Sequence, residues 1–173
     1  MLLINLYGSP GAGKSTCAAY IFSQIKLKQI NAELVTEFAK DLVWEENFKA
    51  LTNQAYVLGN QCYRLSRLKD KTDVVITDSP IMLSTIYVDK KYEPEFTDFV
   101  KKVHQDYVSL NYFIIREKPY NPIGRMQTEE ESDIISIQTK KMLQDNDIKF
   151  KTIKGNIKGF DTIVADIIDK IKK

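Results

Sequence analysis

The sequence predicts an α/β fold: a three-layer αβα sandwich in which helices cover both faces of a five-stranded parallel sheet. Short apolar runs alternate along the chain with longer segments whose apolar residues recur every three or four positions. The runs lack the polar alternation of a half-exposed strand, so both faces of the sheet are expected to be buried. The 173 residues suffice for one full core, and no linker or repeat divides them. Residues 1–173 are therefore expected to form a single domain.

The expected strands are short apolar segments that end at turn-forming residues. The first run ends at Gly8, and the third ends at Asp78, which Ser79 and Pro80 follow. Right-handed crossovers between parallel strands gather the strand ends, and with them a ligand, at one edge of the sheet. The five expected strands are residues 2–7, 33–37, 73–77, 111–115 and 148–153.

The segments between these runs have helical periodicity. The first places Cys17, Ile21 and Ile25 at positions i, i+4 and i+8, which form one apolar stripe. The stretch 117–124 contains two prolines and a glycine, which prevent a helix, so we expect a mobile loop there. The expected helices are residues 14–29, 48–68, 94–108, 129–145 and 160–171.

Composition agrees with a soluble intracellular protein. Apolar residues make up 43% and charged residues 28% of the chain, and no run approaches the ~18 apolar residues that span a bilayer. Cys17 and Cys62 lie on expected helix faces, and we interpret them as free thiols in a reducing compartment. The formal charge of +2 is too small to predict a nucleic-acid partner, although it does not exclude one. We expect a cytoplasmic location and no membrane partner.

The pattern G-x-x-x-x-G-K-[S/T] matches at residues 8–15, between an expected strand and an expected helix. Its glycines let successive backbone N–H groups face phosphate oxygens, and the following helix adds its positive dipole end. Lys14 then reaches the β- and γ-phosphates, while the Ser15 hydroxyl binds Mg²⁺. The alternative is a glycine-rich turn without a ligand. The residues expected to bind ATP here are Gly8, Ser9, Pro10, Gly11, Ala12, Gly13, Lys14, Ser15 and Thr16.

Asp78 ends the third apolar strand, where its carboxylate would lie beside this loop. A carboxylate at the end of a strand next to a phosphate-binding loop typically holds Mg²⁺ directly or through water. We therefore expect Ser15 and Asp78 to be the metal-binding residues. The alternative is that Asp78 caps the turn that Ser79 and Pro80 begin.

With these motifs the chain resembles the small P-loop kinases, the group that contains nucleoside, nucleotide and ribosylnicotinamide kinases, and especially compact kinase-like ATPases of phages. The resemblance covers nearly the whole chain. It implies ATP and Mg²⁺ as cofactors and transfer of the γ-phosphate to a nucleoside- or nucleotide-like acceptor. It also implies a short lid at about residues 117–130, and the host cytoplasm as location if a phage encodes the protein. The oligomeric state is open, with a dimer as one option.

The resemblance extends to the expected acceptor side. The second strand runs into Val-Thr-Glu-Phe-Ala-Lys, in which Glu37 resembles the Glu that faces the acceptor hydroxyl in nucleoside kinases. A carboxylate there orients the nucleophile and takes its proton. Gln54, Gln61 and Arg64 follow on a helix that faces the acceptor in these kinases, where an amide reads the base. Exposed surface side chains are the alternative for all four residues.

The resemblance also assigns residues to the phosphate and adenine sides. Arg116 and Arg125 correspond to lid arginines that neutralise charge on the transferred group, and with Lys14 and Glu37 they complete the expected catalytic set. Solvated arginines are the alternative. Gly155 and Asn156 follow the fifth strand, where a loop packs on adenine through its backbone.

One departure from the family pattern leaves the acceptor open. The Asp-Arg pair of nucleotide kinases is replaced by Asp78-Ser79-Pro80. A first alternative function is a kinase acting on 5-hydroxymethyl-pyrimidine in phage DNA, with scattered lysine pairs contacting the DNA backbone. A second is a non-kinase P-loop NTPase or switch that binds a protein partner.

Overall fold

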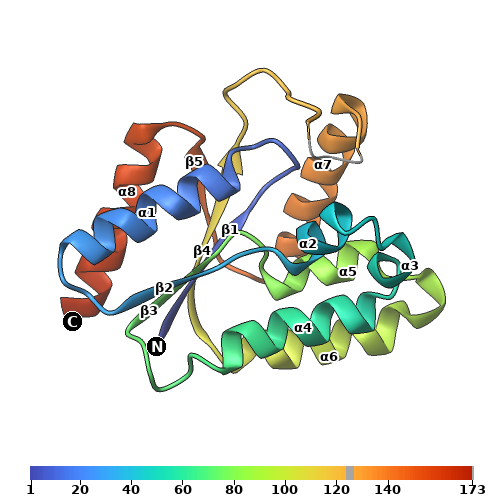
Figure 1. The fold of residues 1–173 in the computed structure, drawn as a ribbon, viewed down its shortest axis with the longest axis horizontal. Helices are drawn as coiled ribbons and strands as arrows, with labels where there is room; N and C mark the ends of the chain where they lie inside the picture. The colour runs from blue at the N-terminus through green and yellow to red at the C-terminus, as the bar shows by residue number, and fades with distance from the viewer. Residues whose placement is uncertain (124–126, 173) are drawn as a thin grey trace.

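The computed structural model describes residues 1–123 and 127–172. Within them, five strands form one parallel sheet in the order β2-β3-β1-β4-β5, which confirms the predicted fold class (Figure 1). The order places β1 at the centre, and the later strands add on both sides of it. The strands are β1 (Leu2–Tyr7), β2 (Ala32–Val35), β3 (Val74–Thr77), β4 (Val108–Ile115) and β5 (Lys151–Lys154).

Helices cover both faces of this sheet. On one face lie α1 and α8, and on the other lie α4, α6, α7 and the shorter helices (Figure 1). In the described part of the chain, no helix is long and apolar enough to cross a membrane. The helices are α1 (Lys14–Leu27), α2 (Phe38–Trp44), α3 (Phe48–Leu51), α4 (Gln54–Ser66), α5 (Ser84–Tyr87), α6 (Glu93–Gln105), α7 (Glu129–Asp145) and α8 (Ile157–Lys172), with 3-10 turns at Ile81–Leu83 and Lys90–Tyr92.

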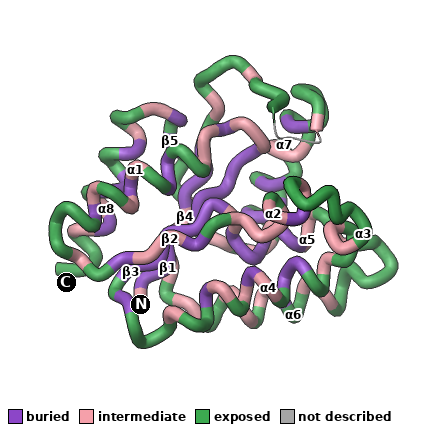
Figure 2. The backbone as a smooth tube through the Cα atoms, viewed as in Figure 1, coloured by how far each residue is buried: buried purple, intermediate pink, exposed green. Residues whose placement is uncertain are grey.

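The central strand shows why the apolar runs lack alternation. All six residues of β1 are buried (Figure 2). Leu2, Ile4 and Leu6 pack with α1 and α8, whereas Leu3 and Tyr7 pack with α4, α6 and α7. Successive side chains point to opposite faces of a strand, so a strand covered on both faces needs apolar residues at nearly every position.

The helical segment expected at 48–68 is two helices. Asn47 caps α3 by accepting a hydrogen bond from the backbone N–H of Ala50, and Asn53 caps α4 by accepting one from Tyr56, each at 3.2 Å. Asparagine competes in this way for backbone donors, and it therefore starts new helices inside a segment whose apolar spacing looks continuous. The short helices α2 and α5 were not expected from the sequence either.

The strand ends deliver the expected site residues to one edge of the sheet. The phosphate-binding loop follows β1, Glu37 follows β2 and Asp78 follows β3. On the other side of β1, Arg116 follows β4 and Gly155 follows β5. Because the pairing is parallel throughout, these five chain segments emerge on the same side of the molecule.

The first turn of α8 packs unusually close to β5. A Cβ added to Gly159 would lie 2.2 Å from the carbonyl oxygen of Lys154 and 2.7 Å from Cγ2 of Ile153. The Gly159 N–H also donates to the Oδ1 of Asn156 at 3.0 Å, which fixes the start of the helix.

We predict that Gly159→Ala lowers the free energy of unfolding by about 1–3 kcal/mol, the usual range for overpacking. The matched control is Gly59→Ala in α4, where an added Cβ would meet nothing within 4 Å. There, alanine's helix propensity should raise stability by up to about 1 kcal/mol. Urea unfolding of both variants measures the difference, and a Gly159→Ala protein at least as stable as wild type would contradict the packing described.

Candidate active site

The loop at residues 8–15 has a backbone that requires glycine. Gly8 and Gly13 have φ angles of 139° and 94°, in the region that L side chains rarely adopt. A Cβ on Gly8 would lie 2.7 Å from the carbonyl oxygen of Ile114 on β4, so a side chain is excluded by contact as well. Gly13 is the N-cap of α1, and the loop therefore leads directly into a helix N-terminus. This arrangement suits an anion.

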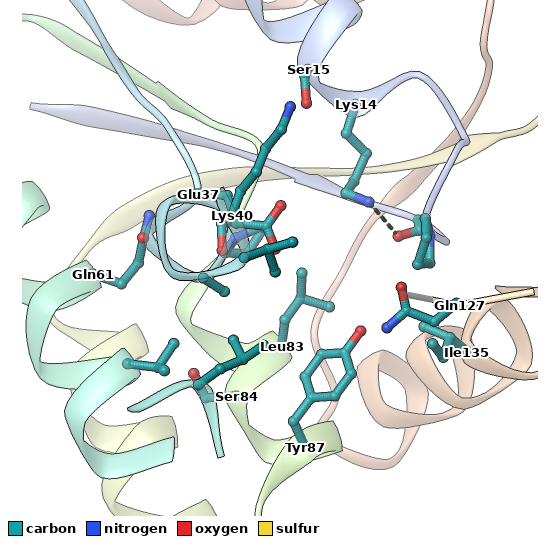
Figure 3. Close-up of a pocket in the computed structure, with 18 of the residues that line it drawn as sticks. Lys14, Ser15, Glu37, Lys40, Gln61, Leu83, Ser84, Tyr87, Gln127 and Ile135 are labelled. Atoms are coloured by element: carbon teal, nitrogen blue, oxygen red, sulfur yellow. Dashed lines mark hydrogen bonds between the residues drawn. The ribbon is translucent and has the colours of Figure 1, made fainter. Parts of the chain in front are cut away.

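Lys14 lies across this loop. Its Nζ donates to the carbonyl oxygen of Gly8 at 2.9 Å (Figure 3) and to that of Ser9 at 3.0 Å. The ammonium group is thus held over the backbone that would receive phosphate oxygens. Ser15 and Thr16, at the start of α1, line the same cavity.

A cavity of about 510 Å³ connects this loop with a pocket formed by α2, α4 and α5 (Figure 3). The volume is within the range of small-molecule sites. Outside the loop, the wall combines apolar side chains with convergent polar groups. The apolar lining includes Val43, Trp44, Leu51, Val57, Leu83 and Ile135, and the polar lining includes Glu37, Lys40, Gln54, Gln61, Ser84 and Tyr87.

Glu37 occupies the junction between β2 and α2. It is the N-cap of α2 in an extended conformation, yet its side chain makes no capping hydrogen bond. Acidic N-cap residues usually turn back to the helix N–H groups, whereas this one lines the cavity. Tyr87 is 45% exposed as a whole residue, but burial of its hydroxyl group and, secondarily, the negative charge of Glu37 raise the pKa of Tyr87 to about 12. The Tyr87 hydroxyl therefore stays protonated at neutral pH and can donate a hydrogen bond into the cavity.

Gln54 and Gln61 both line the cavity, as the resemblance implies, but they differ in their hydrogen bonds. Gln54 donates to the carbonyl oxygen of Leu51 at the end of α3. Gln61 is 3% exposed, and its amide forms hydrogen bonds with the backbone on both sides of Glu37.

Arg64 is not part of the cavity lining. It pairs with Asp41 and donates to the carbonyl oxygen of Thr36, next to Glu37. The expectation that Arg64 contacts an acceptor is thus not supported by its position.

Asp78 is buried at the end of β3 and is not among the residues that line the cavity. It is 5% exposed, and its Oδ1 is buried without a hydrogen-bond partner. β3 pairs directly with β1, so Asp78 emerges beside the loop that carries Ser15. No cluster of three or more His, Cys, Asp or Glu side chains occurs among residues 1–123 and 127–172. One carboxylate, one hydroxyl and nucleotide phosphates form a donor set that fits Mg²⁺, which keeps several waters and needs few protein ligands.

Arg116 lies outside the cavity and supports the loop from behind. Its guanidinium pairs with Glu129 and Asp133 in the first turns of α7 and donates to the hydroxyl of Ser132. Ser132 in turn donates to the carbonyl oxygen of Pro10 at 2.7 Å. In this geometry Arg116 ties the end of β4 to α7, whose Ser132 bonds the phosphate-binding loop, and Arg116 does not line the cavity as a lid arginine would. Arg125 lies outside the described residues, so its catalytic role stays a prediction.

Gly155 and Asn156 lie at the end of β5, next to the loop. A Cβ on Gly155 would lie 2.8 Å from the carbonyl oxygen of Ala12, so only glycine permits this contact between the two segments. The Asn156 side chain bonds Glu117 and the N–H of Gly159. Their expected contact with adenine stays a prediction.

Sequence reasoning missed several polar residues of the cavity, including Lys40 and Tyr87. Figure 3 shows the Lys40 side chain running from α2 toward Ser15, and the Tyr87 hydroxyl directed toward Gln127. Both come from helices of seven and four residues, which are too short to show a period. The only sequence signal for Lys40 was its position three residues after Glu37, on the same face of a helix.

Comparisons with known proteins agree with this geometry. A family described as an AAA domain matches residues 3–159. Deoxyadenosine kinase from M. mycoides with bound dATP superposes with a TM-score of 0.63 at 17% identity, over 99% of this chain and all of that one. The NadR protein in complex with NR gives 0.73 at 18% identity, over 98% of this chain and 51% of that one. No curated protein matches in sequence.

At these identities the two structures are similar in fold, while the family match covers most of the chain. The chain belongs to the AAA-domain family, and it shares its fold with deoxyadenosine kinase and NadR.

Proposed function

We propose that this protein is a kinase that transfers the γ-phosphate of ATP to a hydroxyl group of a nucleoside-like acceptor. The observation that carries the proposal is that the phosphate-binding loop and the Glu37 carboxylate line one cavity. A switch-type NTPase needs a phosphate site, but it does not need an adjoining apolar pocket of this size. Deoxyadenosine kinase, which shares the fold, acts on a molecule of this class.

In the proposed reaction, the loop amides, the α1 N-terminus and Lys14 hold the triphosphate. Bound Mg²⁺, with Ser15 and Asp78 as its protein ligands, would neutralise charge on the phosphate oxygens. Glu37 orients the acceptor hydroxyl and accepts its proton as the new O–P bond forms. The bond from the γ-phosphorus to the bridging oxygen breaks, and ADP leaves.

The lining favours a nucleoside over a nucleoside monophosphate as acceptor. Outside the phosphate-binding loop, Glu37 and Lys40 are the charged residues among the described cavity lining, and Lys40 extends toward Ser15 (Figure 3). The remaining wall offers neutral groups, including the Trp44 ring and the Gln54 amide. Such a wall suits an uncharged base, whereas an acceptor phosphate calls for a basic side chain.

A radiolabelled-ATP transfer screen tests the proposal. The candidate acceptors are nucleosides, nucleoside monophosphates, nicotinamide riboside and DNA containing 5-hydroxymethyl-pyrimidine, with Lys14→Ala as the inactive control. We expect the wild-type protein to transfer label to a nucleoside, and the Lys14→Ala protein to transfer none. Label only in inorganic phosphate would establish the NTPase alternative, and label in DNA would establish the DNA-kinase alternative.

Glu37→Gln removes the proposed base and preserves the size of the side chain. We expect kcat to fall by roughly 10²–10⁴, the usual contribution of a positioned acid–base group, while ATP affinity persists. Steady-state kinetics and ATP titration calorimetry measure the two quantities. Unchanged turnover would exclude Glu37 from the chemistry.

Asp78→Asn should raise the Mg²⁺ concentration that half-saturates activity, because a neutral amide is a poorer ligand for this ion. Without Mg²⁺, the melting temperature of the variant should equal or exceed that of wild type, since a buried carboxylate with an unpartnered oxygen has been neutralised. A lower melting temperature with unchanged Mg²⁺ dependence would identify Asp78 as a capping residue.

A further inference from the structure

We propose that Gln61 and Arg64 of α4 are positioning residues that fix the backbone on both sides of Glu37, and that neither of them reads the acceptor. We call these two side chains the Glu37 clamp. The inference rests on the proposed function, because it assigns their effect on the reaction to the Glu37 carboxylate.

The Gln61 amide spans the peptide groups before and after Glu37. Its Oε1 accepts a hydrogen bond from the N–H of Phe38 at 3.1 Å, and its Nε2 donates to the carbonyl oxygen of Thr36 at 3.4 Å. The Phe38 N–H belongs to the first turn of α2, where the helix itself supplies no acceptor. With Gln61 only 3% exposed, these bonds satisfy backbone groups that water reaches poorly.

Gln61 also connects this junction to β3. Its Nε2 lies 3.4 Å from the hydroxyl oxygen of Thr77, the residue before Asp78. The acceptor and both donor directions of the amide are therefore engaged with protein groups. To read a base, Gln61 would have to release some of these contacts and leave a buried backbone group unpaired, which is unfavourable.

Arg64 reinforces the same junction one helical turn later. Its Nη1 donates to the carbonyl oxygen of Thr36 at 3.3 Å, and its Nη2 forms an ion pair with Asp41 of α2. The guanidinium also lies 5.0 Å from the centre of the Phe38 ring, within cation–π range. Arg64 thus holds Thr36 on one side of Glu37 and α2 on the other.

The clamp fixes the backbone from which the Glu37 side chain extends. Glu37 is the N-cap of α2, and the peptide groups on both sides of it are bonded by Gln61. Displacement of a reacting group by about 1 Å can lower a rate by about 10²-fold. A rigid junction, bonded through α4 to β3, would prevent such displacement.

A double-mutant cycle tests the clamp. Gln61→Met keeps the side-chain length and removes every hydrogen bond. We expect Gln61→Met to lower kcat by about 10–100-fold and to leave the KM for ATP nearly unchanged. In a Glu37→Gln background the same substitution should lower kcat little further, because the two residues act as a unit. Asn60→Ala is the control: it removes a bond to the Tyr56 carbonyl on the same helix, outside the cavity lining, and should leave kcat unchanged.

The outcomes separate the two proposals. Equal losses from Gln61→Met in both backgrounds, or a raised acceptor KM with normal kcat, would overturn the clamp and make Gln61 an acceptor-binding residue. Full activity of Glu37→Gln alone would overturn the proposed function and the clamp with it. If Gln61→Met does not fold, Arg64→Met enters the same cycle, with the same coupling to Glu37→Gln expected.

Discussion

The parallel pairing of β1 with both β3 and β4 is the constraint on which the candidate site depends. With β1 buried on both faces and flanked by parallel neighbours, the chain must return to the same starting edge before each strand. Each crossover helix therefore ends where the next strand begins, and every strand ends at the opposite edge. Lys14, Glu37 and Asp78 reach one region for this reason, although they are far apart in the sequence.

Close backbone contacts at that edge leave room for little besides glycine. Gly8 lies against a carbonyl of β4, and Gly155 lies against the carbonyl of Ala12. Ser132 of α7, itself bonded by Arg116, donates to the Pro10 carbonyl on the outer side of the loop. The phosphate-binding loop is therefore supported by β4, by the end of β5 and by α7, a preformed arrangement that reduces the ordering needed when a phosphate binds.

The other half of the cavity is built differently. Its walls come from the short helices α2 and α5 and from α4, and side chains of α4 bond the backbone of the β2–α2 junction beside Glu37. The Glu37 carboxylate consequently depends on tertiary contacts, whereas Lys14 depends mainly on local loop geometry. The same distinction explains why the phosphate side is marked by a short motif and the acceptor side is not.

The sequence predicted the sheet, the five strands and the phosphate-binding loop, because burial on both faces and the glycine spacing are local signals. It did not predict α2 or α5, which are shorter than the window that reveals a helical period. Gln61 was expected to face an acceptor because the chain resembles nucleoside kinases, and the sequence could not show that its amide bonds the chain on both sides of Glu37. The role of a polar side chain depends on hydrogen-bond partners that lie far away in the sequence. The residue pattern of a single segment does not reveal those partners.

A crystal structure with Mg²⁺ and a non-hydrolysable ATP analogue tests the central claim, that one cavity presents the γ-phosphate to Glu37. We expect the triphosphate on residues 8–15, with the Lys14 Nζ moved from the carbonyls of Gly8 and Ser9 to phosphate oxygens. The γ-phosphate should face Glu37, with the pocket between α2, α4 and α5 left open for an acceptor. A nucleotide base seated in that pocket, or a Glu37 carboxylate turned away from the γ-phosphate, would contradict the account.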